Sequence, residues 1–218
     1  MIYERIRCAM NDYTDSGFLF SYIRFMNFSP QGGSADFYIG NTLVCAGIKY
    51  GSYSPYIKTS SGPQVYKATR CGKKDEIIDK ITLCQNVGHV DNLCLCGKAD
   101  NAVFFVVNEP KENPDKDYGN LRICNLSIDT DNLNIWANDE MIIGDIEYKN
   151  ISKYLKIKPQ NYEIKITGKE KDFISLGNYQ LNADKYNTIY ITGIKNEMPH
   201  LSGILTLDAA SYDGFYLL

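Results

Sequence analysis

Hydrophobic and polar residues alternate along short stretches of this chain, with the period of two that a β-strand produces when one of its faces is buried. Within residues 22–26 (YIRFM), Ile23 and Phe25 share one face, and residues 35–39 (ADFYI) alternate in the same way. No segment carries the stripe of an amphipathic helix. Because the strands are short and recur about every 8 to 12 residues, the pattern predicts an all-β sandwich.

Turn residues stand between these alternating runs. Gly40-Asn41 separates two runs near the start of the chain, and Asn138-Asp139 does so in the second half. Glycine, asparagine and aspartate are the residues that tight two-residue hairpin loops favour. We therefore predict a hairpin at each position.

The same pattern occurs twice. Shifting the chain by 98 positions aligns Arg24 with Arg122 and Tyr56 with Tyr154, and after a two-residue deletion an offset of 96 aligns further apolar positions. The two halves of the chain stay aligned over most of their length, which indicates tandem copies of one domain. Each copy is predicted to be an antiparallel β-sandwich of seven or eight strands.

The repeat defines the domain organisation. An N-terminal extension (residues 1–17) precedes the first sandwich (18–109), and a second sandwich (118–208) precedes a C-terminal tail (209–218). The connecting segment, residues 110–117 (PKENPDKD), is polar, charged and proline-bearing, as linkers are.

Several short motifs resemble a known family. YIRFMNFSPQGGSADFYIGNTLV, then YGSYSPY, then SGPQVYKATRCG are similar to the bacterial family called domain of unknown function 4397. The residues that match in the first copy are Arg24, Ser29, Pro30, Asp36, Tyr38, Tyr50, Gly51, Gly62 and Tyr66. Asn27 stands where the family favours histidine, and the residues of the Gly40-Asn41 turn are reversed. The resemblance implies an immunoglobulin-like sandwich, usually on secreted or surface proteins, without an established activity.

Charge and hydropathy exclude some partners and locations. A net charge of −3 provides no long-range field for nucleic acid, and no stretch approaches the roughly 20 apolar residues of a membrane span. The N-terminus has no apolar segment of the signal-peptide kind. We therefore expect either a protein that is cytoplasmic or assembled into an envelope or spore layer from inside, or one whose export signal has been removed. The resembled family is usually on the surface or secreted.

The cysteines offer one candidate for chemistry. Seven cysteines without a disulfide-scaffold spacing are expected to be reduced. Cys84, His89, Cys94 and Cys96 lie within 13 residues, and Cys and His are the ligands that zinc prefers. By alternation, Cys94 and Cys96 point outward from the sandwich. Because cysteines two apart on one strand make a poor zinc knuckle, we favour incidental small residues at these positions.

Tyrosines offer a second candidate. YGSYSPY contains Tyr50, Tyr53 and Tyr56, and the second copy places Tyr148 and Tyr154 in the same way. Such rings could form an aromatic platform for a sugar or peptide. We favour the alternative that they pack at strand ends and form hydrogen bonds there, as buried tyrosines normally do.

These observations favour a protein without enzymatic activity. We expect a binding or structural module of a bacterial envelope, surface or spore layer, with no catalytic residue and no cofactor assigned. A protein or polysaccharide partner, and homo-oligomers formed through sheet edges or the chain ends, stay open. The alternative hypothesis is a thiol- or metal-dependent protein that uses Cys84, His89, Cys94 and Cys96.

Overall fold

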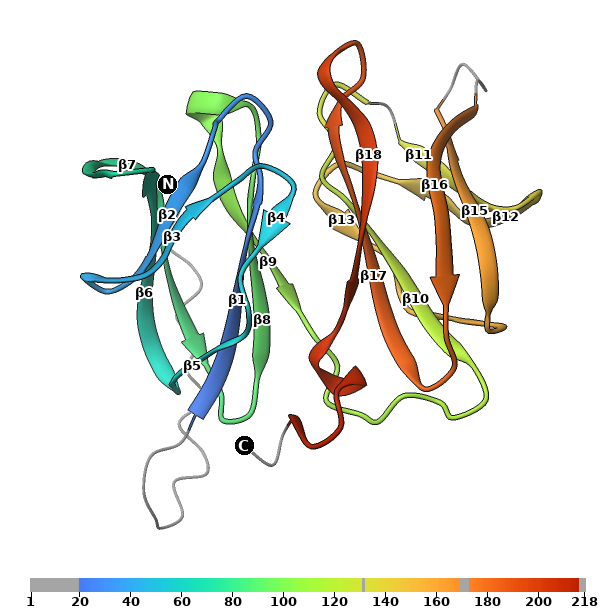
Figure 1. Cartoon of the computed structure of the whole chain (residues 1–218), viewed down its shortest axis with the longest axis horizontal. Helices are drawn as coiled ribbons and strands as arrows, with labels where there is room; N and C mark the ends of the chain where they lie inside the picture. The colour runs from blue at the N-terminus through green and yellow to red at the C-terminus, as the bar shows by residue number, and fades with distance from the viewer. Residues whose placement is uncertain (1–19, 131, 169–172, 216–218) are drawn as a thin grey trace.

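The protein consists mainly of β-strands arranged in two side-by-side sandwiches (Figure 1). The computed structural model describes residues 20–130, 132–168 and 173–215. The first repeat contains the strands β1 (Phe20–Phe28), β2 (Ala35–Ile39), β3 (Thr42–Ile48), β4 (Ser52–Tyr53), β5 (Ile57–Ser60), β6 (Gly62–Arg70), β7 (Lys73–Gln85), β8 (Val90–Cys96) and β9 (Val103–Asn108). The second contains β10 (Gly119–Asn125), β11 (Leu133–Ala137), β12 (Glu140–Ile146), β13 (Asn150–Ile151), β14 (Leu155–Ile157), β15 (Gln160–Thr167), β16 (Phe173–Leu181), β17 (Lys185–Ile194) and β18 (Glu197–Leu207). Two short 3-10 helices, η1 (Ala99–Asn101) and η2 (Ala209–Ser211), follow β8 and β18.

The two repeats have the same topology. In the first, one sheet has the order β4-β1-β8-β9, with β5 also pairing with β1, and the other has the order β3-β2-β6-β7. In the second, β13-β10-β17-β18 with β14 faces β12-β11-β15-β16. This one-to-one correspondence confirms the tandem all-β sandwiches that the sequence predicts. Within the described residues, no helix is long and apolar enough to cross a membrane.

One pair of strands in each repeat departs from the expected antiparallel arrangement. β1 pairs with β8, and β10 with β17, in parallel. β7 belongs to the opposite sheet, so the chain crosses over before β8 enters beside β1. A crossover of this kind brings two strands together in the same direction, whereas a hairpin cannot.

Both predicted hairpin turns are present. Gly40 and Asn41 connect β2 to β3, and Asn138 and Asp139 connect β11 to β12. The first residue of each turn has a positive φ, +59° at Gly40 and +55° at Asn138. Glycine and asparagine tolerate this backbone conformation better than other residues, so the turn chemistry determines where each hairpin bends.

Each sandwich has its own hydrophobic core. In the first repeat, Ile23 and Phe25 of β1 point into the core, as the alternation predicts, and the Phe25 ring stacks on Phe37 at 4.8 Å between centroids. In the second repeat, Ile123 stands in the place of Phe25 and Ile135 in the place of Phe37. The period of two therefore identifies the residues that fill both cores.

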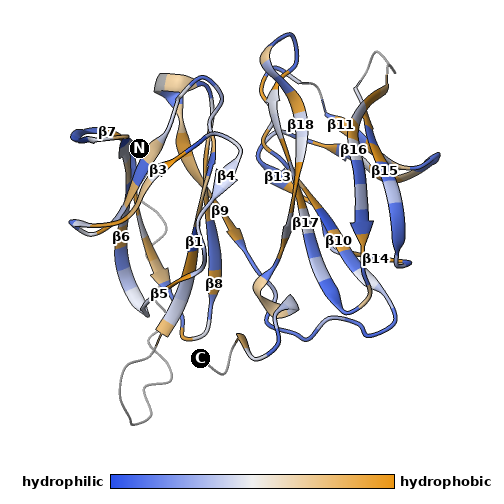
Figure 2. Cartoon of the chain, viewed as in Figure 1, coloured by the Kyte–Doolittle hydropathy of each residue, from blue (hydrophilic) through white to orange (hydrophobic). Residues whose placement is uncertain are grey.

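A third apolar cluster joins the two sandwiches at the junction, which we define as the contact between the β1–β8–β9 sheet and the β10–β17–β18 sheet. It contains residues from both repeats, namely Met26, Phe28, Cys94, Cys96, Val107, Cys124, Leu126 and Tyr190. Figure 2 shows apolar segments on the strands on both sides of it. Because the junction covers their outer faces, β8 and β10 are buried along their whole lengths.

Candidate functional site at the junction of the repeats

The structure places Cys94 and Cys96 in the junction. Leu93 and Leu95 point into the sandwich core, as the register predicts, whereas the two thiols point outward from it and are covered by the second repeat. Both cysteines nevertheless have no exposed surface, because the second repeat covers the face on which they lie. Burial raises the pKa of Cys94 well above its ordinary value and that of Cys96 to about 11. These thiols therefore stay protonated near neutral pH and are poor nucleophiles.

The other two members of the predicted cysteine and histidine cluster are not gathered with them. Cys84, near the end of β7, is disulfide-bonded, so the expectation that all cysteines are reduced is wrong at this residue. His89 is half-buried before β8, and burial lowers its pKa. Within the described residues, no group of three or more His, Cys, Asp or Glu side chains could hold a metal ion.

The predicted tyrosines all lie at or beside the junction, in three different settings. Tyr50 and Tyr148 reach across it: the Tyr50 hydroxyl is 3.3 Å from Thr192 Oγ1, and Tyr148 contacts Cys96. Tyr53 is 42% exposed. The remaining two, Tyr56 and Tyr154, belong to a buried network of charged side chains that the sequence did not predict.

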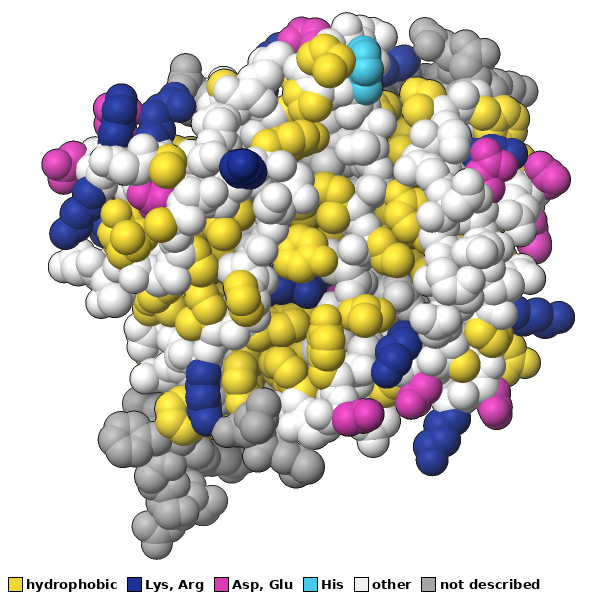
Figure 3. Space-filling view, in the orientation of Figure 1, with side chains coloured by type: hydrophobic (Ala, Val, Ile, Leu, Met, Phe, Trp, Pro, Cys, Tyr) yellow, Lys and Arg dark blue, Asp and Glu magenta, His cyan; other side chains and the backbone are white. Residues whose placement is uncertain are grey.

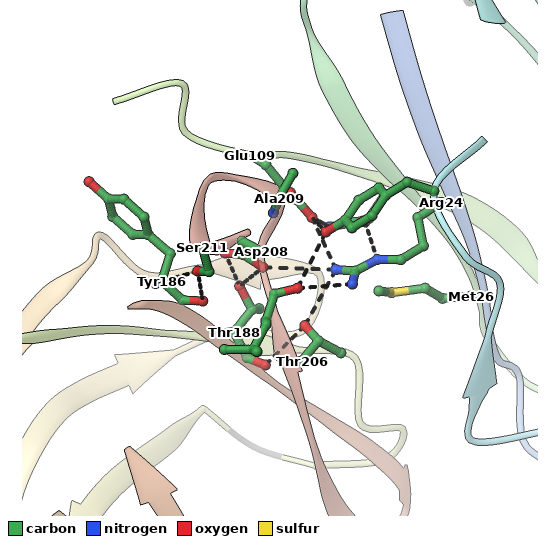
Figure 4. Close-up of polar contacts among 12 residues, drawn as sticks. Arg24, Met26, Glu109, Tyr186, Thr188, Thr206, Asp208, Ala209 and Ser211 are labelled. Carbon is green, nitrogen blue, oxygen red and sulfur yellow. Dashed lines mark hydrogen bonds and ion pairs between the residues drawn. The ribbon is translucent and has the colours of Figure 1, made fainter. Parts of the chain in front are cut away.

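The first half of this network centres on Arg24, which alternation places on the junction face of β1. Its Nε donates to Asn92 Oδ1 at 2.8 Å, and its Nη2 donates to Glu109 Oε1 at 3.0 Å. The guanidinium lies over the Tyr56 ring at 4.4 Å, and the Tyr56 hydroxyl donates to Glu109 Oε1 at 2.7 Å. Figure 4 shows Arg24 pointing from β1 toward Glu109 and the end of β18.

The second half repeats this arrangement with residues of the second sandwich. Arg122 Nε donates to Thr188 Oγ1 at 2.8 Å, and its guanidinium lies over the Tyr154 ring at 4.6 Å. The Tyr154 hydroxyl donates to Asp208 Oδ2. Arg122 Nη2 lies 3.4 Å from the same oxygen, an ion pair without hydrogen-bond geometry.

Each arginine also contacts the opposite repeat. Arg24 Nη1 donates to the carbonyl oxygen of Leu207 at 3.0 Å, and Arg122 Nη1 donates to that of Asn108 at 2.8 Å. Glu109 Oε2 accepts a hydrogen bond of 2.6 Å from the backbone N–H of Ala209. The network therefore links the repeats as well as the strands within them.

Two arginines and two carboxylates balance their charges in a buried site. The side chains of Arg24 and Arg122 are 3% and 7% exposed, and those of Glu109 and Asp208 are fully buried. Burial, reinforced by the neighbouring Asp208 and opposed by Arg24, raises the pKa of Glu109 to about 7. Burial likewise raises the pKa of Asp208, against the attraction of Arg122. Because a buried charge without a partner is costly, the loss of any one of the four groups destabilises the other three.

Above the network, aromatic side chains from the first repeat and from the C-terminal tail form a surface that we call the aromatic patch: Tyr53, Tyr56, Tyr212 and Phe215. The Tyr56 ring lies 6.4 Å from Tyr212 and 5.0 Å from Phe215, both edge-on. Tyr53 and Tyr212 are 42% and 46% exposed. Figure 3 shows hydrophobic side chains gathered along the line where the two repeats meet, with basic side-chain atoms visible between them.

The segment after β18 anchors this patch. η2 is held by the hydrogen bond from Ala209 to Glu109, and Ser211 Oγ accepts from the backbone N–H of Tyr186 at 2.7 Å. Phe215 then packs on Tyr22 of the first repeat, at 4.8 Å between ring centroids. The described part of the predicted tail therefore packs on its own chain, while the predicted N-terminal extension lies outside the described residues.

Sequence reasoning missed the two acids. Glu109 and Asp208 are the last residues of the two predicted sandwiches, and each donates its backbone N–H to the equivalent strand, to Val90 and Tyr186 respectively. Glu109 and Asp208 lie 99 positions apart, whereas the alignment of the two copies used offsets of 98 and 96. The two acids were therefore not aligned with each other. An acid at the same point of each copy, with a matched Arg and Tyr, was the signal that could have found them.

Comparison with known proteins identifies the family. The model of a family described as "Domain of unknown function (DUF4397)" matches residues 21–135 and 119–211, in line with two copies. The chain belongs to the DUF4397 family. Functionally curated proteins gave no match. Among solved structures, this DUF4397 chain is similar to the C-terminal domain of AlgF from P. aeruginosa, with 18% identity, 43% of this chain and 100% of that chain covered, and a TM-score of 0.34.

Two of the residues that carried the family resemblance have structural roles in this DUF4397 protein. Arg24 holds the junction, as described above. Asp36 accepts hydrogen bonds from the backbone N–H groups of Gly47 at 2.7 Å and Gly72 at 2.8 Å, which ties β3 and the turn between β6 and β7 to β2.

Proposed function

We propose that this protein is a non-enzymatic binding module of a bacterial envelope, surface or spore layer, and that its ligand is a polysaccharide bound on the aromatic patch. The observation that carries the proposal is the patch itself. It displays the rings of Tyr53 and Tyr212 at the surface, the first from β4 of the first repeat and the second from the tail that follows the second repeat. Tyrosine combines an apolar ring face with a hydroxyl, so one side chain can stack on a sugar ring and form a hydrogen bond at its edge.

The junction supports this proposal by holding the patch in place. Tyr53 and Tyr56 belong to the first repeat, whereas Tyr212 and Phe215 follow the last strand of the second. Their relative position depends on Glu109, which binds both the Tyr56 hydroxyl and the Ala209 N–H. A site whose side chains are positioned before binding loses less conformational entropy when it takes up a ligand.

The experiment compares binding of the full chain to sacculi and surface polysaccharide prepared from the producing cells. We expect the double variant Tyr53→Ala/Tyr212→Ala to bind at least about tenfold more weakly, which corresponds to about 1.4 kcal/mol. Tyr118→Ala is the matched control, because Tyr118 is 41% exposed and lies outside the patch. Equal binding by the wild type and both variants would contradict the proposal.

Localisation provides an independent check. The producing cells are fractionated through growth and dormancy, and each fraction is probed for the protein. We expect recovery with the envelope or a spore layer. Recovery of a freely diffusing protein in the cytosol at every stage would refute the assignment to an envelope layer.

A further inference from the structure

The junction has the reciprocal contacts of a twofold-symmetric dimer interface, although both halves belong to one chain. Leu207 pairs with Asn187 of β17 as Asn108 pairs with Asp91 of β8, so Leu207 and Asn108 are equivalent positions. Their carbonyl oxygens accept the two reciprocal hydrogen bonds from the arginines of the opposite repeats. In an isologous interface, each contact from one partner is matched by the same contact from the other.

A second reciprocal pair lies elsewhere in the same interface. Tyr50 of the first repeat contacts Thr192 on β17, and Tyr148 of the second contacts Cys96 on β8. Cys96 and Thr192 occupy equivalent register positions, since β1 pairs Met26 with Cys94 as β10 pairs Cys124 with Tyr190. Both the charged and the tyrosine contacts therefore repeat across the junction.

One position breaks this symmetry in a complementary way. Where the first repeat has the small Cys94, the second has Tyr190. The Tyr190 hydroxyl accepts a hydrogen bond of 3.1 Å from Asn92, and its ring lies 5.0 Å from Phe28, so this side chain crosses into the first repeat. Two first repeats would lack that ring and leave a void, whereas two second repeats would bring two such rings together.

We propose that the junction face of each repeat recognises the other repeat without help from the linker, so that the first repeat of one copy fits the second repeat of another copy of this chain. The binding energy comes from the same apolar cluster and the same four buried charges as within one chain. The linker only raises the effective concentration of one repeat at the other. Exchange of repeats between two copies then gives a domain-swapped dimer that preserves every junction contact.

The test uses full-length chains that are cut after folding. A protease recognition sequence is inserted between Glu112 and Asn113, which are exposed in the linker. Two preparations, one of them labelled with heavy nitrogen, are cut, mixed, unfolded in urea without reductant and refolded together. Native mass spectrometry then identifies the pieces in each complex. We expect complexes of one first-repeat piece with one second-repeat piece, half of them containing one labelled and one unlabelled piece.

Two results would overturn the proposal. Pieces that refold but do not associate would show that the face requires the linker, and complexes of two identical repeats would show that Cys94 and Tyr190 do not select the partner. If the pieces do not refold, cut chains that were never unfolded decide the question. On dilution to submicromolar concentration, continued association supports the proposal and separation overturns it. Tyr190→Ala, which removes the crossing ring, is expected to weaken association at least tenfold.

Discussion

Replacing Arg24 by methionine tests whether the buried network holds the repeats together. The substitution keeps an unbranched apolar stem but removes the guanidinium, its charge and its hydrogen bonds to Asn92, Glu109 and the carbonyl oxygen of Leu207. Glu109 is then left buried with its ion-pair partner missing. Because Arg24 lowers the pKa of Glu109, its loss leaves Glu109 either charged without a partner or forced to take up a proton. Removing one partner of a buried pair typically costs about 3–5 kcal/mol in the free energy of unfolding.

The matched control and a second substitution separate charge from packing. Arg70 forms a 3.6 Å ion pair with Glu76 at the surface, with a side chain 39% exposed, so Arg70→Met is expected to cost at most about 1 kcal/mol. Adding Glu109→Gln to Arg24→Met removes the carboxyl group that lost its partner, while the amide oxygen stays as an acceptor for Tyr56. We expect this double variant to recover at least about 1 kcal/mol relative to Arg24→Met.

The assay is urea denaturation followed by two probes. Far-ultraviolet circular dichroism reports both sandwiches, whereas the fluorescence of Trp136, the single tryptophan, reports the second alone. In the wild type we expect coincident transitions, because the junction couples the repeats. In Arg24→Met the midpoint falls and the two transitions separate. If Arg24→Met and Arg70→Met unfold alike, the network does not hold the repeats together.

Three further predictions follow from the junction and the fold. Because the pKa of Glu109 is raised to about 7 in the folded protein, its contribution to stability is fully present below its ordinary value near 4.5 and is lost as pH rises through about 7, by at most about 3 kcal/mol. Urea titrations at pH 5 and pH 8 should show this loss in the wild type and a smaller one in Glu109→Gln; equal losses would contradict the assignment. Iodoacetamide should label the exposed Cys71 under native conditions and leave the buried Cys124 unmodified until urea opens the junction, as peptide mass spectrometry can check; early labelling of Cys124 would mean an open junction. Gly193→Ala places a Cβ 2.4 Å from the carbonyl oxygen of His200 at a φ of +107°, so it should cost more than about 2 kcal/mol in thermal or urea unfolding. Gly168→Ala, whose Cβ would have no atom of the described residues within 4 Å, should change stability by less than about 0.5 kcal/mol.

The sequence predicts the fold because alternation and turn chemistry are local properties. Ile23 and Phe25 are assigned to the core from their spacing alone, and Gly40 marks a hairpin because few residues adopt its backbone conformation. The same spacing places Arg24 on the opposite face. It cannot say that a second sandwich covers that face, because a period of two identifies which residues share a face and not what lies against it.

The candidate site depends on contacts between distant parts of the chain. Arg24 and Asp208 lie 3.9 Å apart although nearly the whole described chain separates them in sequence. The repeat matches Arg24 with Arg122 and Tyr56 with Tyr154. This match shows only that both copies keep these side chains, and it does not show which residues they contact. The polar partner, a carboxylate that follows the last strand, becomes evident only when the two sandwiches are placed against each other.

The covered face of the first repeat has a consequence for synthesis of the chain. Met26, Phe28 and Cys94 leave the ribosome with the first sandwich, but the strands that cover them, β10, β17 and β18, follow the linker. At about 5–20 residues per second, the roughly 100 residues up to Asp208 take on the order of 5–20 s. During that interval the junction face of the first repeat, with its apolar side chains and the charged Arg24 and Glu109, is not yet covered by the second repeat. We expect this uncovered face to be the part of the growing chain most prone to aggregate, because an exposed apolar patch of this kind is a site of association.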